Sequence, residues 1–281
     1  MHKIGIIGNG FVGSSIAAGF GLHADVRVYD VDPKRTMDPL ESVLDCDFIF
    51  VCVPTPMRLD DHNKIDLSLV KKVFETASRL NKKDNIFILK STAIPGTTHQ
   101  LAQEYPNLNI IFNPEFLTER SARLDFINSS RIILGGHVEL CNRVKLLYRE
   151  RFPHTPIVML DAKSAEFIKY MCNCFFSTKI SFMNEMKQAA DVLGLEWDSI
   201  VLGFLLDGRI GNSHVDVPGH DGNAGFGGKC FPKDLNAFIN FFKSIGVDPK
   251  VLSSAWEKNL EVRKDADWER IEGATSNFKG E

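Results

Sequence analysis

The sequence predicts an α/β fold, in which a mostly parallel sheet is covered by helices on both faces, followed by a helical part. In the first half of the 281 residues, short apolar runs alternate with amphipathic helical patterns. From residue 162 onward, apolar residues instead recur at steps of three and four. We therefore expect a sheet domain at 1–161 and a helical domain at 162–281.

The elements of the first part follow from the spacing of their apolar residues. Strands are predicted at 3–7, 25–29, 48–53, 85–89, 109–112, 131–134 and 156–160. Helices are predicted between them, at 11–22, 66–80, 97–105 and 138–151. Because parallel strands need a crossover helix between them, this order predicts a doubly wound sheet.

The composition is that of an ordinary globular protein, with 44% hydrophobic and 25% charged residues. The formal net charge of −3 provides no basic surface for nucleic acid. No apolar run approaches the roughly 20 residues of a membrane-spanning helix, and the start of the chain shows no cleavable signal. The six cysteines lack the paired spacing of a metal site, so we expect no metal and a reduced, cytoplasmic location.

The sequence GNGFVG at 8–13 stands between the first predicted strand and the first predicted helix. In a dinucleotide-binding turn of this kind, Gly8 allows the tight bend and Gly10 lets the backbone approach a pyrophosphate. Gly13 permits close packing of the helix on the strand. The motif therefore predicts a Rossmann-like, dinucleotide-binding domain, with a glycine turn needed only for packing as the alternative.

The acid at the end of the second predicted strand indicates which dinucleotide is bound. Asp30 stands at about the distance expected for the residue that accepts a hydrogen bond from the ribose 2′-hydroxyl. Its carboxylate would repel a 2′-phosphate, which favours NAD as the cofactor. Lys34 and Arg35 follow closely and leave NADP open.

The apolar positions from 162 to 193 predict one helix of about thirty residues, longer than most helices of globular domains. Lys169 and Asn173 stand four residues apart and share one face of it. Taken alone, they are more simply a solvated lysine and a surface amide. A helix of this length needs a partner to cover its apolar sides, which predicts a homodimer.

A glycine-rich stretch at 207–229 has seven glycines in 23 residues and cannot form a regular element. It leads into a predicted helix at 230–243, where Pro232 is tolerated only in the first turn. Cys230 should therefore lie at or beside the helix N-cap. A thiol there, with a lysine on either side, is expected to have a lowered pKa and more thiolate character. We interpret Cys230 as a candidate nucleophile, with a packing role as the alternative.

Together these motifs make the chain resemble the UDP-glucose / UDP-N-acetylmannosamine 6-dehydrogenase family. The matching motifs run in family order to about residue 265: GIIGNGFVG, VYDVD, VPTP at 53–56, KST at 90–92, NPEFLTE at 113–119, FIKYMCN at 167–173, NE at 184–185, RIG at 209–211 and GFGGKCFPKD at 225–234. The resemblance implies oxidation of the primary alcohol of a UDP-sugar to a carboxylate in two hydride transfers to NAD. The intermediates would be a cysteine thiohemiacetal and thioester. Supply of polysaccharide precursors is the implied purpose.

The resemblance also implies roles for individual residues. The implied catalytic set comprises the nucleophile Cys230, the oxyanion partners Lys169 and Asn173, the base Glu119, and the water-positioning residues Asp234 and Thr92. The implied cofactor-binding residues are Gly8, Gly10, Phe11, Val12, Gly13, Asp30, Lys34, Arg35, Val53, Pro54, Thr55, Ser91, Thr92, Glu119 and Lys233. The implied substrate-binding residues are Glu115, Phe116, Leu117, Lys169, Arg209, Gly227 and Cys230, with Arg209 supplied in cis or by a neighbouring subunit. Cys172 and Cys174 are interpreted as packing residues.

The sequence departs from the family pattern at its end. Family members carry a third domain that binds the uridine diphosphate. We expect that domain to be absent here, with a helix at about 249–270 followed by a frayed tail at 271–281. The alternatives are a smaller alcohol substrate, a third domain supplied by another chain, and a catalytically weak NAD-binding homologue. A two-electron β-hydroxyacid or 6-phosphogluconate dehydrogenase would use the lysine and asparagine of the long helix but would not need KCFPKD.

Overall fold

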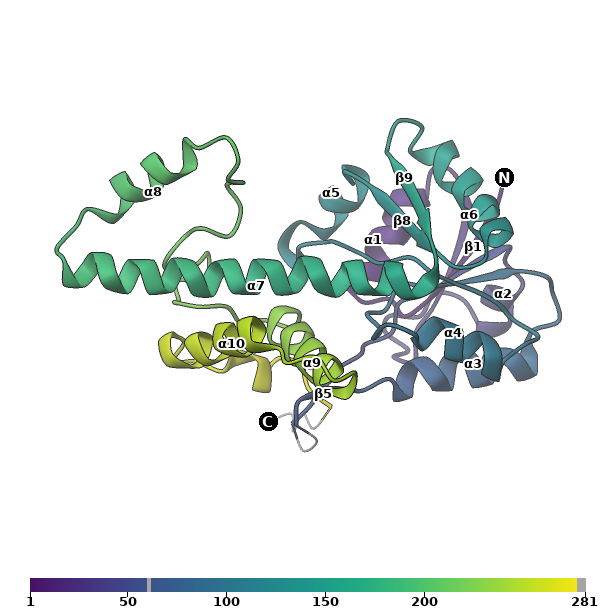
Figure 1. The fold of residues 1–281 in the computed structure, drawn as a ribbon. Helices are drawn as coiled ribbons and strands as arrows, with labels where there is room; N and C mark the ends of the chain where they lie inside the picture. Colours follow the sequence, from purple (N-terminus) through teal and green to yellow (C-terminus); the bar gives the residue numbers. More distant parts are fainter. Residues whose placement is uncertain (60–61, 277–281) are drawn as a thin grey trace. The chain divides into compact units, whose positions relative to one another are not determined.

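The computed structural model describes residues 1–59 and 62–276, which form two compact units. Unit 1 comprises residues 1–55 and 66–169, and unit 2 comprises residues 56–65 and 170–281. The 31-residue helix α7 (Ala162–Val192) begins in unit 1 and continues in unit 2 (Figure 1). Among the described residues, no helix is both long enough and apolar enough to cross a membrane.

Unit 1 is built on a seven-stranded sheet with the order β2-β1-β3-β6-β7-β8-β9 (Figure 1). The strands are β1 (Lys3–Ile7), β2 (Asp25–Tyr29), β3 (Phe48–Val51), β6 (Ile86–Leu89), β7 (Asn109–Phe112), β8 (Ile132–Gly135) and β9 (Ile157–Leu160). All neighbouring strands pair in parallel except β7 and β8, which are antiparallel. Ile7 pairs with both Tyr29 and Val51, so the carboxyl ends of β1, β2 and β3 meet at one edge. The predicted doubly wound, mostly parallel sheet is confirmed.

Helices cover both faces of this sheet because successive side chains of each buried strand point to opposite sides. The helices of unit 1 are α1 (Phe11–Phe20), α2 (Leu40–Leu44), α3 (Ser68–Leu80), α4 (Thr97–Glu104), η1 (Glu119–Ser121), α5 (Ala122–Ile127) and α6 (Val138–Arg151). Ile6 belongs to the apolar cluster with α1, α5 and α6, whereas Ile7 belongs to the cluster with α2, α3, α4 and the start of α7. Figure 1 shows α3 and α4 on the face opposite α5 and α6.

The predicted strands and helices of unit 1 agree with the observed ones to within two residues at each end. Helices α2 and α5, which have only five and six residues, were not predicted from the sequence. A helix of that length completes too few turns to show a helical period in its apolar residues.

Unit 2 is mainly helical. The rest of α7 is followed by α8 (Trp197–Leu205), α9 (Phe231–Ser244), α10 (Lys250–Val262) and η2 (Asp267–Glu269). It also contains a hairpin of two short strands, β4 (Met57–Arg58) and β5 (Lys64–Ile65), which the sequence analysis missed. The hairpin lies between β3 and α3 in the sequence, but β5 packs against α9.

Two predictions for the end of the chain are wrong. The helix expected at 249–270 ends at Val262, because the backbone of Arg263 has an extended conformation. The expected frayed tail is ordered as far as residue 276, since the Met57 N–H donates to the Ala274 carbonyl (2.8 Å) and the Ser276 N–H to the Met57 carbonyl (3.0 Å). Ala274 and Thr275 are buried. Residues 277–281 of the predicted tail lie outside the described residues.

Candidate active site

The turn between β1 and α1 has the geometry that its glycines predict. Gly8 has a φ of +97°, and a Cβ there would lie 2.7 Å from the Cys52 carbonyl oxygen. A Cβ on Gly13 would lie only 1.9 Å from the Gly8 carbonyl oxygen, so a side chain would separate α1 from the turn. Among the described residues, apart from its chain neighbours and its own helix, no atom lies within 4 Å of a Cβ built on Gly10, the N-cap of α1. This leaves space in front of a helix N-terminus, whose N–H groups and dipole suit a phosphate.

Asp30 lies beside this turn. Its carboxylate accepts hydrogen bonds from the backbone N–H groups of Asn9 (2.6 Å) and Asp32 (2.9 Å). The Asn9 side chain in turn donates to the Arg35 carbonyl (2.7 Å), and the side chains of Lys34 and Arg35 are exposed. The structure thus brings the glycine turn, Asp30 and the 34–35 segment together. The roles of these residues in binding NAD remain predictions.

The other predicted cofactor-binding residues of unit 1 follow neighbouring strands. Phe11 and Val12 are half-buried in the first turn of α1, and Val53, Pro54 and Thr55 follow β3. Ser91 and Thr92 follow β6, and the Ser91 hydroxyl donates to the Val53 carbonyl (2.7 Å). In open α/β sheets, ligands bind at the carboxyl ends of the strands.

A buried polar cluster follows β6 and β7 in unit 1. The Lys169 ammonium lies 2.7 Å from Glu115 Oε1, and the two side chains are only 4% and 7% exposed. Lys90 Nζ donates to Asn113 Oδ1 (3.2 Å) and to the Pro114 carbonyl (3.1 Å). Separate roles were predicted for Lys169 and Glu115, and this ion pair was not. Lys90 and Asn113 were not predicted as site residues, although Lys90 lies in the KST motif and Asn113 in the NPEFLTE motif.

Burial and charge set the ionisation of this cluster. Burial alone would raise the pKa of Glu115, but Lys169, the Leu117 N–H and Lys90 outweigh it and hold the pKa below its ordinary value. Burial lowers the pKa of Lys90 to about 8, and the nearby Glu115 offsets only part of this effect. The cluster therefore holds a fixed anion between ammonium groups, and such preorganised donors can stabilise a developing oxyanion.

Cys230 is the N-cap of α9 in unit 2, as predicted, and its side chain is half-buried. The Asp234 N–H donates to its carbonyl (2.8 Å). The carboxylate of Asp234 is fully buried and accepts hydrogen bonds from Asn173 of α7 (2.5 Å) and from Lys233. The first turn of α9 is thus tied to α7 through a buried polar group, one turn beyond the cysteine.

The remaining predicted residues are held in different ways. Glu119 is exposed at the start of η1, and Arg209 is exposed and pairs with Asp207 through Nε and Oδ1 (2.9 Å). The Phe116 ring lies 4.1 Å from the guanidinium carbon of Arg131. Burial raises the pKa of Cys174, which fits its predicted packing role.

A doubly wound sheet with a glycine turn after β1 and an acid after β2 is typical of dinucleotide-binding dehydrogenases. Comparison with known proteins identifies the family. Residues 34–151 match the NAD binding domain, and residues 163–261 the central domain, of the UDP-glucose/GDP-mannose dehydrogenase family. The chain belongs to this family. This confirms NAD as the cofactor. It also confirms the predicted enzyme class, an oxidoreductase that acts on CH–OH groups.

Individual relatives agree with this assignment. The chain is 29% identical to the UDP-glucose 6-dehydrogenase AglM of Haloferax volcanii, over 96% of this chain and 74% of the relative. It is 32% identical to the UDP-glucose 6-dehydrogenase YwqF of Bacillus subtilis over 78% of this chain, and spans about half of that relative (50%). The structure of a UDP-glucose dehydrogenase from Pyrobaculum islandicum superimposes with a TM-score of 0.81 at 28% identity, covering 93% of this chain and 68% of that one.

Proposed function

We propose that this protein oxidises the primary alcohol of a UDP-sugar to a carboxylate, with Cys230 as the nucleophile. The observation that carries the proposal is the environment of Cys230. A half-buried thiol at the N-cap of α9 precedes the buried Asp234, which Asn173 and Lys233 hold. A cysteine that served only packing would not need two buried polar side chains in the next turn and a third, Asn173 of α7, bound to Asp234, since buried polar groups are costly unless they are paired.

The reaction needs two hydride acceptors, and NAD supplies this chemistry when it is bound. The residues present suit that cofactor, because Gly10 leaves room for a phosphate and Asp30 places a carboxylate beside the glycine turn. Loss of a hydride from the alcohol carbon and of a proton from its oxygen gives an aldehyde. The Cys230 thiolate then adds to the carbonyl carbon, and the resulting oxyanion takes up a proton to give a thiohemiacetal.

Loss of a second hydride converts the thiohemiacetal to a thioester, with release of the hydroxyl proton. Water then attacks the thioester carbon, which releases the carboxylate and restores the Cys230 thiol. Lys169 is proposed to donate to the oxyanion of each addition step, and Glu115 keeps its ammonium in place. Glu119 is proposed as the base that takes the proton of the attacking water, with Thr92 and Asp234 positioning that water.

The test is the number of NADH molecules formed per sugar consumed, measured by absorbance with NAD and a panel of UDP-sugars. Two NADH per sugar, lost in Cys230→Ala, are expected. Cys172→Ala is the matched control, because Cys172 is another half-buried cysteine of unit 2 and should keep full activity. Turnover that survives in Cys230→Ala would disprove the thioester route. NAD binding without turnover of any UDP-sugar would instead point to a smaller alcohol or a weak homologue.

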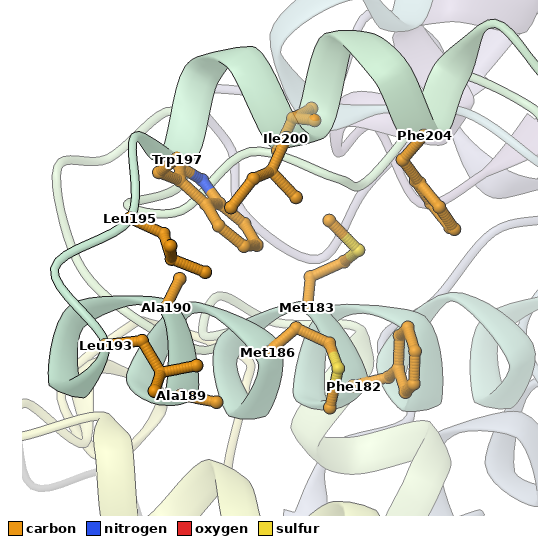
Figure 2. Close-up of a pocket in the computed structure, with 11 residues that line it drawn as sticks. Phe182, Met183, Met186, Ala189, Ala190, Leu193, Leu195, Trp197, Ile200 and Phe204 are labelled. Atoms are coloured by element: carbon orange, nitrogen blue, oxygen red, sulfur yellow. The ribbon is translucent and has the colours of Figure 1, made fainter.

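We also propose that two copies of the chain associate through α7 and α8. An apolar pocket of about 320 Å³ lies between these helices, and Phe182, Met186, Ile200 and Phe204 help to line it (Figure 2). No residue of α8 is buried, although most of its residues are apolar. Such a surface needs cover, and a second copy would supply a complementary apolar face. Light scattering should report a dimer that Ile200→Glu dissociates and that Ser199→Glu, at an exposed residue of α8 outside the pocket lining, does not.

A further inference from the structure

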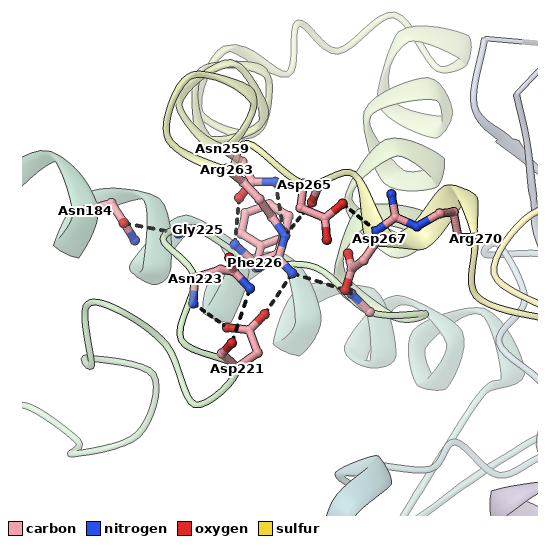
Figure 3. Close-up of polar contacts among 11 residues, drawn as sticks. Asn184, Asp221, Asn223, Gly225, Phe226, Asn259, Arg263, Asp265, Asp267 and Arg270 are labelled. Atoms are coloured by element: carbon pink, nitrogen blue, oxygen red, sulfur yellow. Dashed lines mark hydrogen bonds and ion pairs between the residues drawn. The ribbon is translucent and has the colours of Figure 1, made fainter.

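The last part of the glycine-rich stretch, residues 219–228, is held by α10 and the turn after it (Figure 3). Asn259 of α10 contacts Phe226 twice, since its Oδ1 accepts from the Phe226 N–H (2.7 Å) and its Nδ2 donates to the Phe226 carbonyl (3.0 Å). Asn184 of α7 accepts from the Gly225 N–H (3.1 Å). The backbone before Cys230 is therefore fixed by side chains of two helices of unit 2.

Arg263 is the centre of this arrangement. Its side chain is only 1% exposed, and its Nη2 lies 2.8 Å from Asp221 and 3.1 Å from Asp267. Its Nε donates to the Asp265 carbonyl (3.0 Å), and Asp267 also accepts from the Gly228 N–H (3.2 Å). We call Asn259, Arg263, Asp267 and Asp221 the α10 clamp. Through these contacts the guanidinium joins the start of the 219–228 segment to its end.

The glycines of this segment lie directly on the clamp. A Cβ on Gly225 would lie 2.4 Å from Asn259 Oδ1, and a Cβ on Gly227 would lie 2.3 Å from both Arg263 Nη2 and Asp267 Oδ1. Neither position has room for a side chain. The backbone at 225–228 therefore follows the surface of the clamp, and Cys230, the N-cap of α9, follows two residues later.

The clamp is a costly way to hold a loop. A buried cation loses its hydration, and Arg263 Nη1 is buried without a hydrogen-bond acceptor among the residues that the structure describes. Burial alone would raise the pKa of Asp221, but Arg263 and the Asn223 N–H outweigh it, and the pKa lies below its ordinary value. Apolar residues could fill the same space more cheaply, but they would not fix the direction of the backbone amides.

We propose that Arg263 is a positioning residue that sets the geometry of the Cys230 thiol at the start of α9. The inference rests on the proposed function, in which Cys230 is the nucleophile. The clamp fixes the backbone at 225–228, and this backbone sets where the thiol lies relative to the N–H groups of the first turn of α9. A thiolate is stabilised at a helix N-terminus only while it stays aligned with those groups.

The experiment measures the alkylation rate of Cys230 by iodoacetamide from pH 5.5 to 9, with peptide mass spectrometry to follow each cysteine. Arg263→Lys keeps the charge but loses the planar fork that reaches two carboxylates. Asp221→Asn is the milder second variant, because Asp221 lies at the surface. The control is Arg270→Lys, which changes an exposed arginine paired with Asp265 (2.6 Å). The buried thiol of Cys174 serves as the internal reference for opening of unit 2.

Loss of alignment should lower the alkylation rate of Cys230 near pH 7 about two- to five-fold and move the midpoint of its pH profile upward. Cys174 should stay slow, and Arg270→Lys should match the wild type. A Cys230 profile unchanged in both Arg263→Lys and Asp221→Asn would overturn the inference. A profile that changes only together with the Cys174 rate would overturn it as well, because the clamp would then act on stability alone. The proposed function is judged separately, from NADH formation by the wild type.

Discussion

Replacing Lys90 with methionine should change how the stability of the protein depends on pH. Lys90 is 5% exposed, and its ammonium contacts Asn113 Oδ1 and the Pro114 carbonyl. Methionine has a similar length and carries no charge. The substitution removes a donor from Asn113 Oδ1 and from the Pro114 carbonyl. Asn113 Oδ1 would keep the hydrogen bond from the Tyr148 hydroxyl (2.5 Å).

The magnitude follows from the pKa of Lys90, which burial lowers from 10.5 to about 8. At about 1.4 kcal/mol per pH unit, this difference corresponds to roughly 3 kcal/mol of cost while the buried ammonium is charged. Between pH 8 and pH 10.5 the unfolded chain keeps the proton that the folded chain has released. The contribution of Lys90 to stability therefore rises with pH between about 8 and 10.5 and is constant below pH 8, where both states carry the proton. Between pH 7 and pH 10 the free energy of unfolding of the wild type should rise by about 2 to 3 kcal/mol relative to Lys90→Met.

The charged groups around Lys90 do not alter the direction of this effect. Burial is the largest influence on the pKa of Lys90, while Glu115 raises this pKa and Lys169 lowers it. Burial also raises the pKa of Cys52 to about 12, so this thiol stays neutral in the window.

Urea unfolding at pH 7, 8, 9 and 10 measures the effect as the difference between the wild type and the variant. Groups that titrate in both proteins cancel in this difference. Lys82→Met, which removes an exposed lysine of the same unit, is the control and should follow the wild type at every pH. A difference between wild type and Lys90→Met that stays constant from pH 7 to pH 10 would refute the reasoning.

Three further predictions concern unit 1. Gly13→Ala should destabilise the protein by about 3 kcal/mol or more, because the new Cβ would lie 1.9 Å from the Gly8 carbonyl oxygen. Gly10→Ala is the matched control, because its Cβ would have open space around it. This variant should keep the melting temperature of the wild type and weaken only NAD binding, measured by fluorescence titration. Asp30→Asn should weaken NAD binding about ten-fold and narrow the preference for NAD over NADP, and equal losses for both cofactors would contradict the role of the carboxylate. Glu166 is buried and accepts hydrogen bonds from the N–H groups of Gly96 (2.5 Å) and Thr98 (2.7 Å), yet burial raises its pKa. The stability that Glu166 contributes should thus fall as the pH rises through its folded pKa, so Glu166→Gln should cost more at pH 4 than at pH 7 in urea unfolding.

Unit 1 could be predicted closely because its signals are local. The glycine turn, the acid after β2 and the apolar runs of the strands each occupy a few adjacent residues, and the parallel sheet follows from their order. The partners within the buried cluster could not be predicted. Nothing in the sequence indicates that Lys169 meets Glu115, because the two residues are 54 positions apart and only the folded sheet brings them together.

The end of α10 shows why unit 2 was harder to predict. The apolar spacing favours a helix that continues to residue 270, and no glycine or proline stops it at Val262. The helix ends there because Arg263 takes an extended backbone and binds Asp221, 42 positions earlier, together with Asp267 and the Asp265 carbonyl. The contact with Asp221 forms only when the glycine-rich stretch lies on α10, so a tertiary interaction overrides the local preference for helix. The same contacts that end the helix also hold the backbone before Cys230. If the clamp serves only to end α10, Arg263→Lys will change stability and leave the alkylation of Cys230 as it is. If it positions the thiol, the alkylation of Cys230 will change while unit 2 stays closed.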